Sequence, residues 1–229
     1  MCGRTRLSVP PSDLADVFQA KLGPAAVDDA LNLNCAPTDP VLVVRLARDS
    51  RERELVLMRW GLVPFYVHEF RDAKPIINAR VETVATSRAF RDAFKKRRCL
   101  ILADGFYEWL QQSAPRKKKL PHLVQRPDHT AFAMAGLWDR WKGAPGVSIE
   151  TCTIITRPPV GEVAQLHDRM PVALDARDHT AWLDPATEPP RLHDILDHAI
   201  ADWVVTPITS VPDSSRKKQL RLFASALDK

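Results

Sequence analysis

The sequence lacks any long apolar run. No stretch of its 229 residues approaches the roughly 18 consecutive apolar residues that a membrane-spanning helix needs. The first residues also lack the apolar segment that marks a secretory signal. We therefore expect a cytoplasmic protein without a membrane partner.

Closely spaced metal-binding and disulfide-forming residues are also missing. The four cysteines are scattered, no two of them form a C-x-x-C pair, and the seven histidines are equally dispersed. This spacing does not fit a structural zinc site, and a reducing compartment disfavours a disulfide framework. We expect neither a bound metal nor a cofactor.

Internal repeats and a regular strand–helix alternation are absent as well. The chain is 45% hydrophobic, enough to bury a sizeable core, and its 19 prolines are spread out rather than gathered in a linker. Strand-like segments predominate, with short helices between them. We therefore expect one α+β domain over residues 1–229, with a barrel-like or strongly twisted mixed sheet at its core and short helices at its periphery.

Local patterns predict individual elements of this domain. Ser12 precedes apolar residues at helical spacing and is predicted to cap a helix. Residues 41–47 and 54–60 flank a polar turn and are predicted to form a hairpin. The dipeptide Asp104-Gly105 suits a tight turn, so a second hairpin is predicted around it.

The charge is moderately basic. The net charge is +5 and the sequence pI is about 9.2, which fits an anionic partner such as nucleic acid. Basic clusters occur at residues 95–98, 116–119 and 216–218. Each cluster taken alone is more typical of a solvated loop or helix end.

Two motifs place polar side chains inside apolar, strand-like segments. In "GFYEWL", Glu108 has apolar neighbours on either face of a strand, so burial should raise its pKa. In "IINARVET", alternation places Asn78 and Arg80 on one face, where they could orient a polar reactant and hold an anion. An ion pair for Glu108 and a backbone contact for Asn78 are equally ordinary explanations.

Two further motifs are ambiguous in the same way. In "QLHDRMP", His167 precedes Met170-Pro171 in a loop or strand entry, where it could shuttle protons or lie idle at the surface. In "RWGLVP", Trp60 beside Arg59 could stack on a nucleic-acid base, although a tryptophan more commonly belongs to the core.

The opening "MCGR" places a cysteine directly after the initiator methionine. If Met1 is removed, Cys2 carries a free α-amine and a thiol on one residue. An α-amine with a pKa of about 7.7–8.0 is substantially neutral near neutral pH and is therefore nucleophilic.

Together these motifs resemble those of one family. "MCGR", "NCAPT", "RWGLVP", "INARVETV", "RRCLILADGFYEW" and "LHDRMPVAL" follow one another as in the SRAP family, the SOS-response-associated peptidases or abasic-site processing proteins. The resemblance runs from Cys2 to about Thr209. The chain departs from the family pattern at Arg157-Pro158-Pro159, at Ile101-Leu102 and in "TPITSVPD". The first and the last of these departures could reshape the floor of a binding groove.

The resemblance implies chemistry at abasic sites in single-stranded DNA, including sites at junctions with duplex DNA. The ring-opened sugar is an aldehyde, which the amine and thiol of Cys2 would capture as a thiazolidine crosslink that shields the lesion, with lyase chemistry through the imine. The resemblance implies that Cys2 is the nucleophile, that Glu108 and His167 transfer protons, and that Asn78 positions Cys2 or the sugar. It implies DNA contacts by Arg4, Arg80 and Arg169 and, less directly, by Arg88; Trp60 is the stacking candidate.

Two alternatives remain open at this stage. Cys2 could attack a peptide carbonyl with His167 as base, as a thiol peptidase or in removing Met1 itself. The chain could instead bind single-stranded DNA without reacting. The expected protein is monomeric and associates with the bacterial nucleoid when engaged on DNA.

Overall fold

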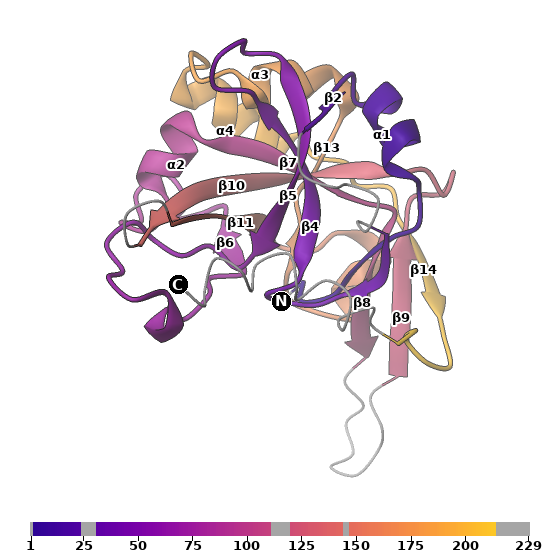
Figure 1. Ribbon diagram of the computed structural model, residues 1–229. Helices are drawn as coiled ribbons and strands as arrows, with labels where there is room; N and C mark the ends of the chain where they lie inside the picture. Colours follow the sequence, from indigo (N-terminus) through magenta and orange to yellow (C-terminus); the bar gives the residue numbers. More distant parts are fainter. Residues whose placement is uncertain (1, 24–30, 111–119, 144–146, 214–229) are drawn as a thin grey trace.

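The computed structural model describes residues 2–23, 31–110, 120–143 and 147–213. Their secondary structure consists of short strands with a few short helices, in two sheets (Figure 1). The basic clusters at 116–119 and 216–218 lie outside the described residues.

The first sheet has five strands in the order β14-β9-β8-β1-β3. Their bounds are Thr5–Leu7 (β1), Asn32–Cys35 (β3), Gly105–Leu110 (β8), Leu120–Gln125 (β9) and Val204–Pro207 (β14).

The second sheet has nine strands. They are Lys21–Leu22 (β2), Pro40–Leu46 (β4), Arg53–Trp60 (β5), Asn78–Arg80 (β6), Arg98–Ala103 (β7), Phe132–Lys142 (β10), Ser148–Arg157 (β11), Met170–Pro171 (β12) and Ala173–Leu174 (β13).

The helices are short and lie mainly at the periphery (Figure 1). The α-helices are Pro11–Val17 (α1), Arg91–Lys96 (α2), His179–Leu183 (α3) and Pro189–Asp197 (α4), and the 3-10 helices are Phe70–Asp72 (η1), Gly161–Gln165 (η2) and Ala176–Asp178 (η3).

Five strands of the second sheet close into a ring. β11 pairs with β10, β10 with β7, β7 with β4 and β4 with β5, and β5 pairs back onto β11 in parallel. Closure leaves none of these strands with a free edge. The barrel-like α+β fold predicted from the sequence is confirmed, as is the hairpin of β4 and β5.

The two faces of the barrel strands belong to different cores. Along β7, Leu100 and Leu102 pack with helix residues such as Trp182, whereas Cys99 and Ile101 belong to the cluster that contains Cys2. The second cluster draws from all five ring strands and fills the barrel. Its interior is tight: a Cβ added at Gly136 would lie 2.8 Å from the Ile101 side chain and 2.9 Å from Cys99 Sγ.

The second predicted hairpin is wrong. β7 ends at Ala103 and β8 begins at Gly105, but β7 pairs with β4 and β10 whereas β8 pairs with β1 and β9. The chain thus passes from one sheet to the other at Asp104. Gly105 packs closely there: an added Cβ would lie 2.9 Å from the Leu123 side chain and 3.2 Å from the Val124 carbonyl oxygen.

The predicted capping of the first helix is also wrong in detail. Helix α1 begins at Pro11 with Pro10 as its N-cap, because proline is well suited to the first helical position. The Ser12 hydroxyl contacts Asp13 instead, inside the helix. Leu14 and Phe18 are buried as predicted, but Val17 is exposed.

Candidate functional site

Cys2 lies just before β1, in the interior of the protein. The residue is 0% exposed and packs in the barrel cluster. Its backbone carbonyl accepts a hydrogen bond of 2.9 Å from Asn78 Nδ2. Burial raises the pKa of the Cys2 thiol well above its usual range, and the nearby Glu108 carboxyl adds to this effect. At neutral pH the thiol therefore keeps its proton.

Glu108 lies on β8, the strand that pairs with β1. The pairing sets Thr5 opposite Phe106, and the Tyr107 amide donates to the Arg4 carbonyl at 3.0 Å. Glu108 is 3% exposed, and its Oε1 is a buried atom without a hydrogen-bond partner among the described residues. Burial raises the pKa of Glu108 to about 7, with a smaller contribution from the negative charge of Asp168. The carboxyl can therefore donate or accept a proton near neutral pH.

Asn78 and Arg80 lie at the two ends of the short strand β6. This strand pairs in parallel with β11, with Asn78 opposite Ile154 and Arg80 opposite Thr156. Asn78 is half-buried, and its Oδ1 has no partner among the described residues. Arg80 is exposed. One amide group thus holds Cys2 and also offers a free acceptor.

His167 lies in the loop between η2 and β12, as the sequence predicts. Its side chain is 25% exposed, and Nδ1 lies 2.6 Å from Asp168 Oδ1 and 3.1 Å from the Arg169 backbone nitrogen. Unprotonated, Nδ1 accepts from the Arg169 N–H; protonated, it donates to the Asp168 carboxylate. The loop therefore offers a separate contact for each protonation state, as a proton shuttle requires.

The four candidate DNA-binding arginines differ in their surroundings. Arg4 donates to Asn34 Oδ1 at 2.8 Å, and the exposed Arg88 lies over the Tyr66 ring, 4.6 Å from its centroid. Arg169 binds both carboxylate oxygens of Glu82, at 2.7 and 2.8 Å. A phosphate that approaches Arg169 must therefore compete with Glu82.

Trp60 is fully buried in the barrel cluster, where its indole N–H donates to the Ile77 carbonyl at 2.9 Å. No face of this ring is open to a base. We therefore assign Trp60 to the core, the more common of the two roles that the sequence allows.

Asp168 and Glu82 were not predicted from the sequence as site residues. Both are acidic neighbours of candidate residues: Asp168 acts on Glu108 and His167, and Glu82 occupies Arg169. Both lie within motifs visible in the sequence, Asp168 in "HDR" and Glu82 in "RVET", but their partners depend on the fold.

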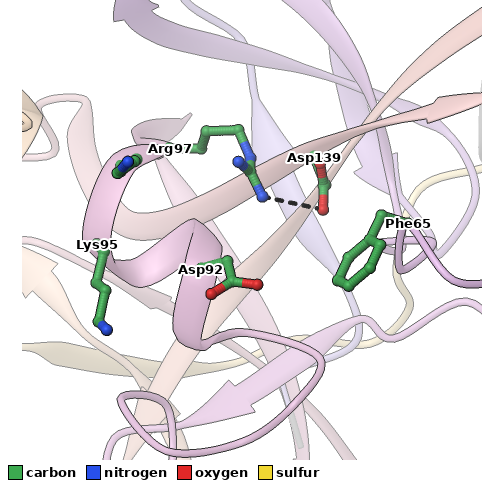
Figure 2. Close-up of a pocket in the computed structure, with 6 residues that line it drawn as sticks. Phe65, Asp92, Lys95, Arg97 and Asp139 are labelled. Atoms are coloured by element: carbon green, nitrogen blue, oxygen red, sulfur yellow. Dashed lines mark hydrogen bonds and ion pairs between the residues drawn. The ribbon is translucent and has the colours of Figure 1, made fainter.

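A separate pocket of about 380 Å³ lies on other elements, beside α2 and β10 (Figure 2). Within it, Arg97 pairs with Asp139 at 3.2 Å. Its lining mixes both charges with one aromatic ring: Phe65, Asp92, Lys95, Lys96, Arg97 and Asp139. None of the candidate residues around Cys2 lines this pocket.

The described residues contain neither a metal-binding cluster nor a membrane-spanning helix. No group of three or more histidine, cysteine, aspartate or glutamate side chains in this part of the chain could hold a metal ion. Among the helices that the structure describes, none is both long and apolar enough to cross a membrane.

Comparison with solved structures supports the fold. A protein from Bacteroides thetaiotaomicron superposes with a TM-score of 0.78 at 23% identity, over 91% of this chain and 93% of that one. A protein from Bordetella bronchiseptica gives a TM-score of 0.76 at 25% identity, over 91% of this chain and all of that one.

Comparison with curated sequences identifies relatives along nearly the full length. The abasic site processing protein YoaM of Bacillus subtilis is 36% identical over 97% of both chains. The abasic site processing protein HMCES of Xenopus tropicalis is 28% identical over 99% of this chain and 79% of its own. The family model for SOS response associated peptidases matches residues 1–211. The chain thus belongs to the SRAP family, whose motifs its sequence carries in order.

Proposed function

We propose that this chain processes abasic sites in single-stranded DNA and, once Met1 is removed, forms a thiazolidine crosslink between Cys2 and the lesion. The observation that carries the proposal is the contact set around Cys2. Asn78 holds its carbonyl, and a buried carboxyl of raised pKa lies nearby. The names of the relatives as abasic site processing proteins support the same substrate.

The reaction proceeds in two steps. First, the α-amine of Cys2 attacks the aldehyde carbon of the ring-opened sugar, and loss of one water leaves an imine. Second, the thiol sulfur adds to the imine carbon while its proton passes to the imine nitrogen, which closes a five-membered ring. Because amine and thiol belong to one residue, closure costs little orientational entropy. No oxidant or reductant is required.

The surroundings of Cys2 favour this order of events. The raised pKa of the thiol leaves the amine as the first nucleophile. Glu108, with a pKa of about 7, can protonate the departing water, then accept the thiol proton and pass it on to the imine nitrogen. In our proposal His167 carries protons between Glu108 and solvent. Ring closure also consumes the imine from which strand cleavage would otherwise proceed.

DNA contact would be largely electrostatic. We propose that Arg4, Arg80, Arg88 and Arg169 bind backbone phosphates, so that the protein accepts any sequence around the lesion. Each phosphate contact on a single strand contributes about 0.7 to the slope of log affinity against log salt. Substituting one of these arginines should therefore lower the slope by about that amount.

The direct test is a denaturing gel with an oligonucleotide that contains one abasic site. The protein is first shown by intact mass to lack Met1. The wild-type chain should give an adduct that survives denaturation, and Cys2→Ala should give none. Cys2→Ala keeps an α-amine, so borohydride should trap its imine. Comparing the stable wild-type adduct with the trapped imine of Cys2→Ala separates imine formation by the amine from ring closure by the thiol. If Met1-free wild-type protein forms no stable adduct, the proposal is wrong.

A peptidase role is a second candidate because the family description names one. Its narrowest form is the self-removal of Met1 with Glu108 or His167 as the proton-transfer group. Intact mass decides the question: self-processing leaves Met1 on Glu108→Ala, whereas a host aminopeptidase removes it from both proteins.

A noncovalent binder would hold intact and abasic strands with equal affinity, and Cys2→Ala would not change that affinity.

A further inference from the structure

The pocket beside α2 and β10 adjoins one of the proposed DNA contacts. Arg88 lies over the Tyr66 ring, 4.6 Å from its centroid, and the Tyr66 ring meets the neighbouring Phe65 ring edge to face, with the two centroids 5.5 Å apart. Phe65 in turn lines the pocket. These three side chains thus form a continuous row that leads from a proposed phosphate contact into the pocket.

Phe65 presents an aromatic ring to solvent at this pocket. The residue is 58% exposed, whereas Trp60, a few positions earlier in the chain, is fully buried. Every nucleobase has a flat face that can stack on such a ring, so exposed aromatic side chains bind single strands of any sequence. The stacking role that the buried Trp60 cannot take is therefore open to Phe65.

The charged side chains of the pocket include two lysines whose charge is not used elsewhere. Lys95 and Lys96 are exposed in the last turn of α2, and neither forms an ion pair among the described residues. Arg97, by contrast, is paired with Asp139 at 3.2 Å, and Asp92 is the other carboxylate of the lining. Cations outnumber carboxylates in this lining, so the lysine side of the pocket suits a phosphate.

We propose that this pocket binds one nucleotide that flanks the lesion in the same single strand, with its base against Phe65 and its phosphate on Lys95 and Lys96. Figure 2 shows Phe65 and Lys95 on opposite sides of the pocket, which suits a base joined to its phosphate through a sugar. The volume of about 380 Å³ lies within the range of small-molecule sites, roughly 300–1,000 Å³. The inference rests on the proposed function, because it extends the path of the DNA that reacts at Cys2.

The direct test compares crosslinking on abasic strands that extend from the lesion on one side or on the other. The adduct at Cys2 fixes the register of the strand, so only one of the two extensions reaches the pocket. On that strand, at protein concentrations below saturation, Phe65→Ala should lower the crosslinking rate by about fivefold, because it removes a stacking surface. The rate on the other strand, and the maximal rate on both, should stay within about twofold of wild type. Phe65→Trp should restore the lost rate.

Lys95→Gln tests the phosphate contact. In fluorescence anisotropy with a long intact strand, it should weaken binding and lower the slope of log affinity against log salt by about 0.7, the value for one phosphate contact on a single strand. Its control is Lys21→Gln, which removes an exposed lysine on β2 and should leave the slope unchanged. The control for Phe65→Ala is Val17→Ala, which removes an exposed apolar side chain from α1.

Equal losses on the two strands, losses of the same size in the controls, or no loss at all would overturn the inference. Thermal unfolding shows whether Phe65→Ala folds; if it does not, Lys95→Gln decides. If wild-type protein itself forms no adduct, the proposed function fails. The anisotropy measurements on the intact strand then still decide whether the pocket binds nucleic acid.

Discussion

Two carboxyl groups four residues apart, Asp104 and Glu108, are buried almost equally but in different ways. They are 2% and 3% exposed and flank the same neighbouring strand, β1. Asp104 Oδ2 accepts hydrogen bonds from the Ser8 amide, at 2.7 Å, and from the Ser8 hydroxyl. Its Oδ1 makes no hydrogen bond among the described residues but lies 3.3 Å from the positively charged Arg6 Nε, whereas Glu108 forms no ion pair among those residues. Glu108 has an oxygen without a partner among the described residues, and its pKa is raised to about 7.

The two carboxyl groups therefore differ in how burial is compensated, and the pKa of Glu108 is raised. A buried charge is tolerable when hydrogen bonds and a countercharge replace water, as they do at Asp104. A buried carboxyl without that support is costly to ionise, so its proton becomes available for chemistry near neutral pH. A carboxyl group paired with Arg6 thus lies near one end of β1, and a carboxyl group of raised pKa lies near the other.

Substituting Glu108 should produce the largest effect. Glu108→Gln preserves shape but cannot transfer a proton, so the crosslinking rate should fall by about 10²–10⁴-fold. Single-turnover gels with an abasic oligonucleotide measure this rate. Binding to an intact strand should change little. A rate within about threefold of wild type would show that Glu108 does not transfer the proton.

Substituting Asp104 should act on stability instead. Asp104→Ala leaves the Ser8 amide and the Arg6 guanidinium without their partner, so the free energy of unfolding should fall by about 3 kcal/mol. Urea denaturation measures the loss. Below the unfolding transition, crosslinking should remain within about threefold of wild type. A selective loss of activity in a stable Asp104→Ala protein would contradict the comparison.

The raised pKa of Glu108 should make the free energy of unfolding depend on pH. Its folded-state pKa, about 7, lies above the ordinary value of 4.5, so the folded protein binds the proton more tightly than the unfolded chain. Stability from this group is present at low pH and is lost as the pH rises through about 7. Relative to Glu108→Gln, wild-type protein should lose about 2 kcal/mol between about pH 5 and about pH 8. Parallel stability curves for the two proteins would disprove the shift.

A third carboxylate, Glu82, extends the comparison to the surface. Substituting it should produce the smallest effect of these changes. Its hydrogen bonds from Arg169 lower its pKa to about 2, so it is ionised and occupies that arginine at neutral pH. Glu82→Gln should weaken the pair and strengthen single-strand binding by about two- to threefold, with a steeper salt dependence. Fluorescence anisotropy at several salt concentrations measures both. The effect should vanish when Arg169→Gln is also present.

The sequence predicted much of the fold because alternation and branched residues marked the strands. β4 and β5 form the predicted hairpin, and the two buried faces of β4 explain its continuous apolar run. The error at Asp104-Gly105 has a physical cause. The dipeptide has the composition of a tight turn, but here the aspartate links two sheets and the glycine permits close packing. Composition alone does not distinguish these uses.

The candidate site was predictable in part. Family motifs pointed to Cys2, Asn78 and Glu108, and the structure brings them near one another. The isolation of Glu108 was expected from its apolar neighbours, but the support around Asp104 was not, because Ser8 reaches it across a separation of 96 residues.

The position of β1 has a mechanical consequence. β1 is not an edge strand: β8 lies on one side of it and β3 on the other. If a DNA strand were joined at Cys2, a motor translocating along that DNA would pull on the chain just ahead of β1. Drawing β1 out would divide the five-stranded sheet into two parts, so force on the nucleic acid would dismantle the very sheet that holds Glu108.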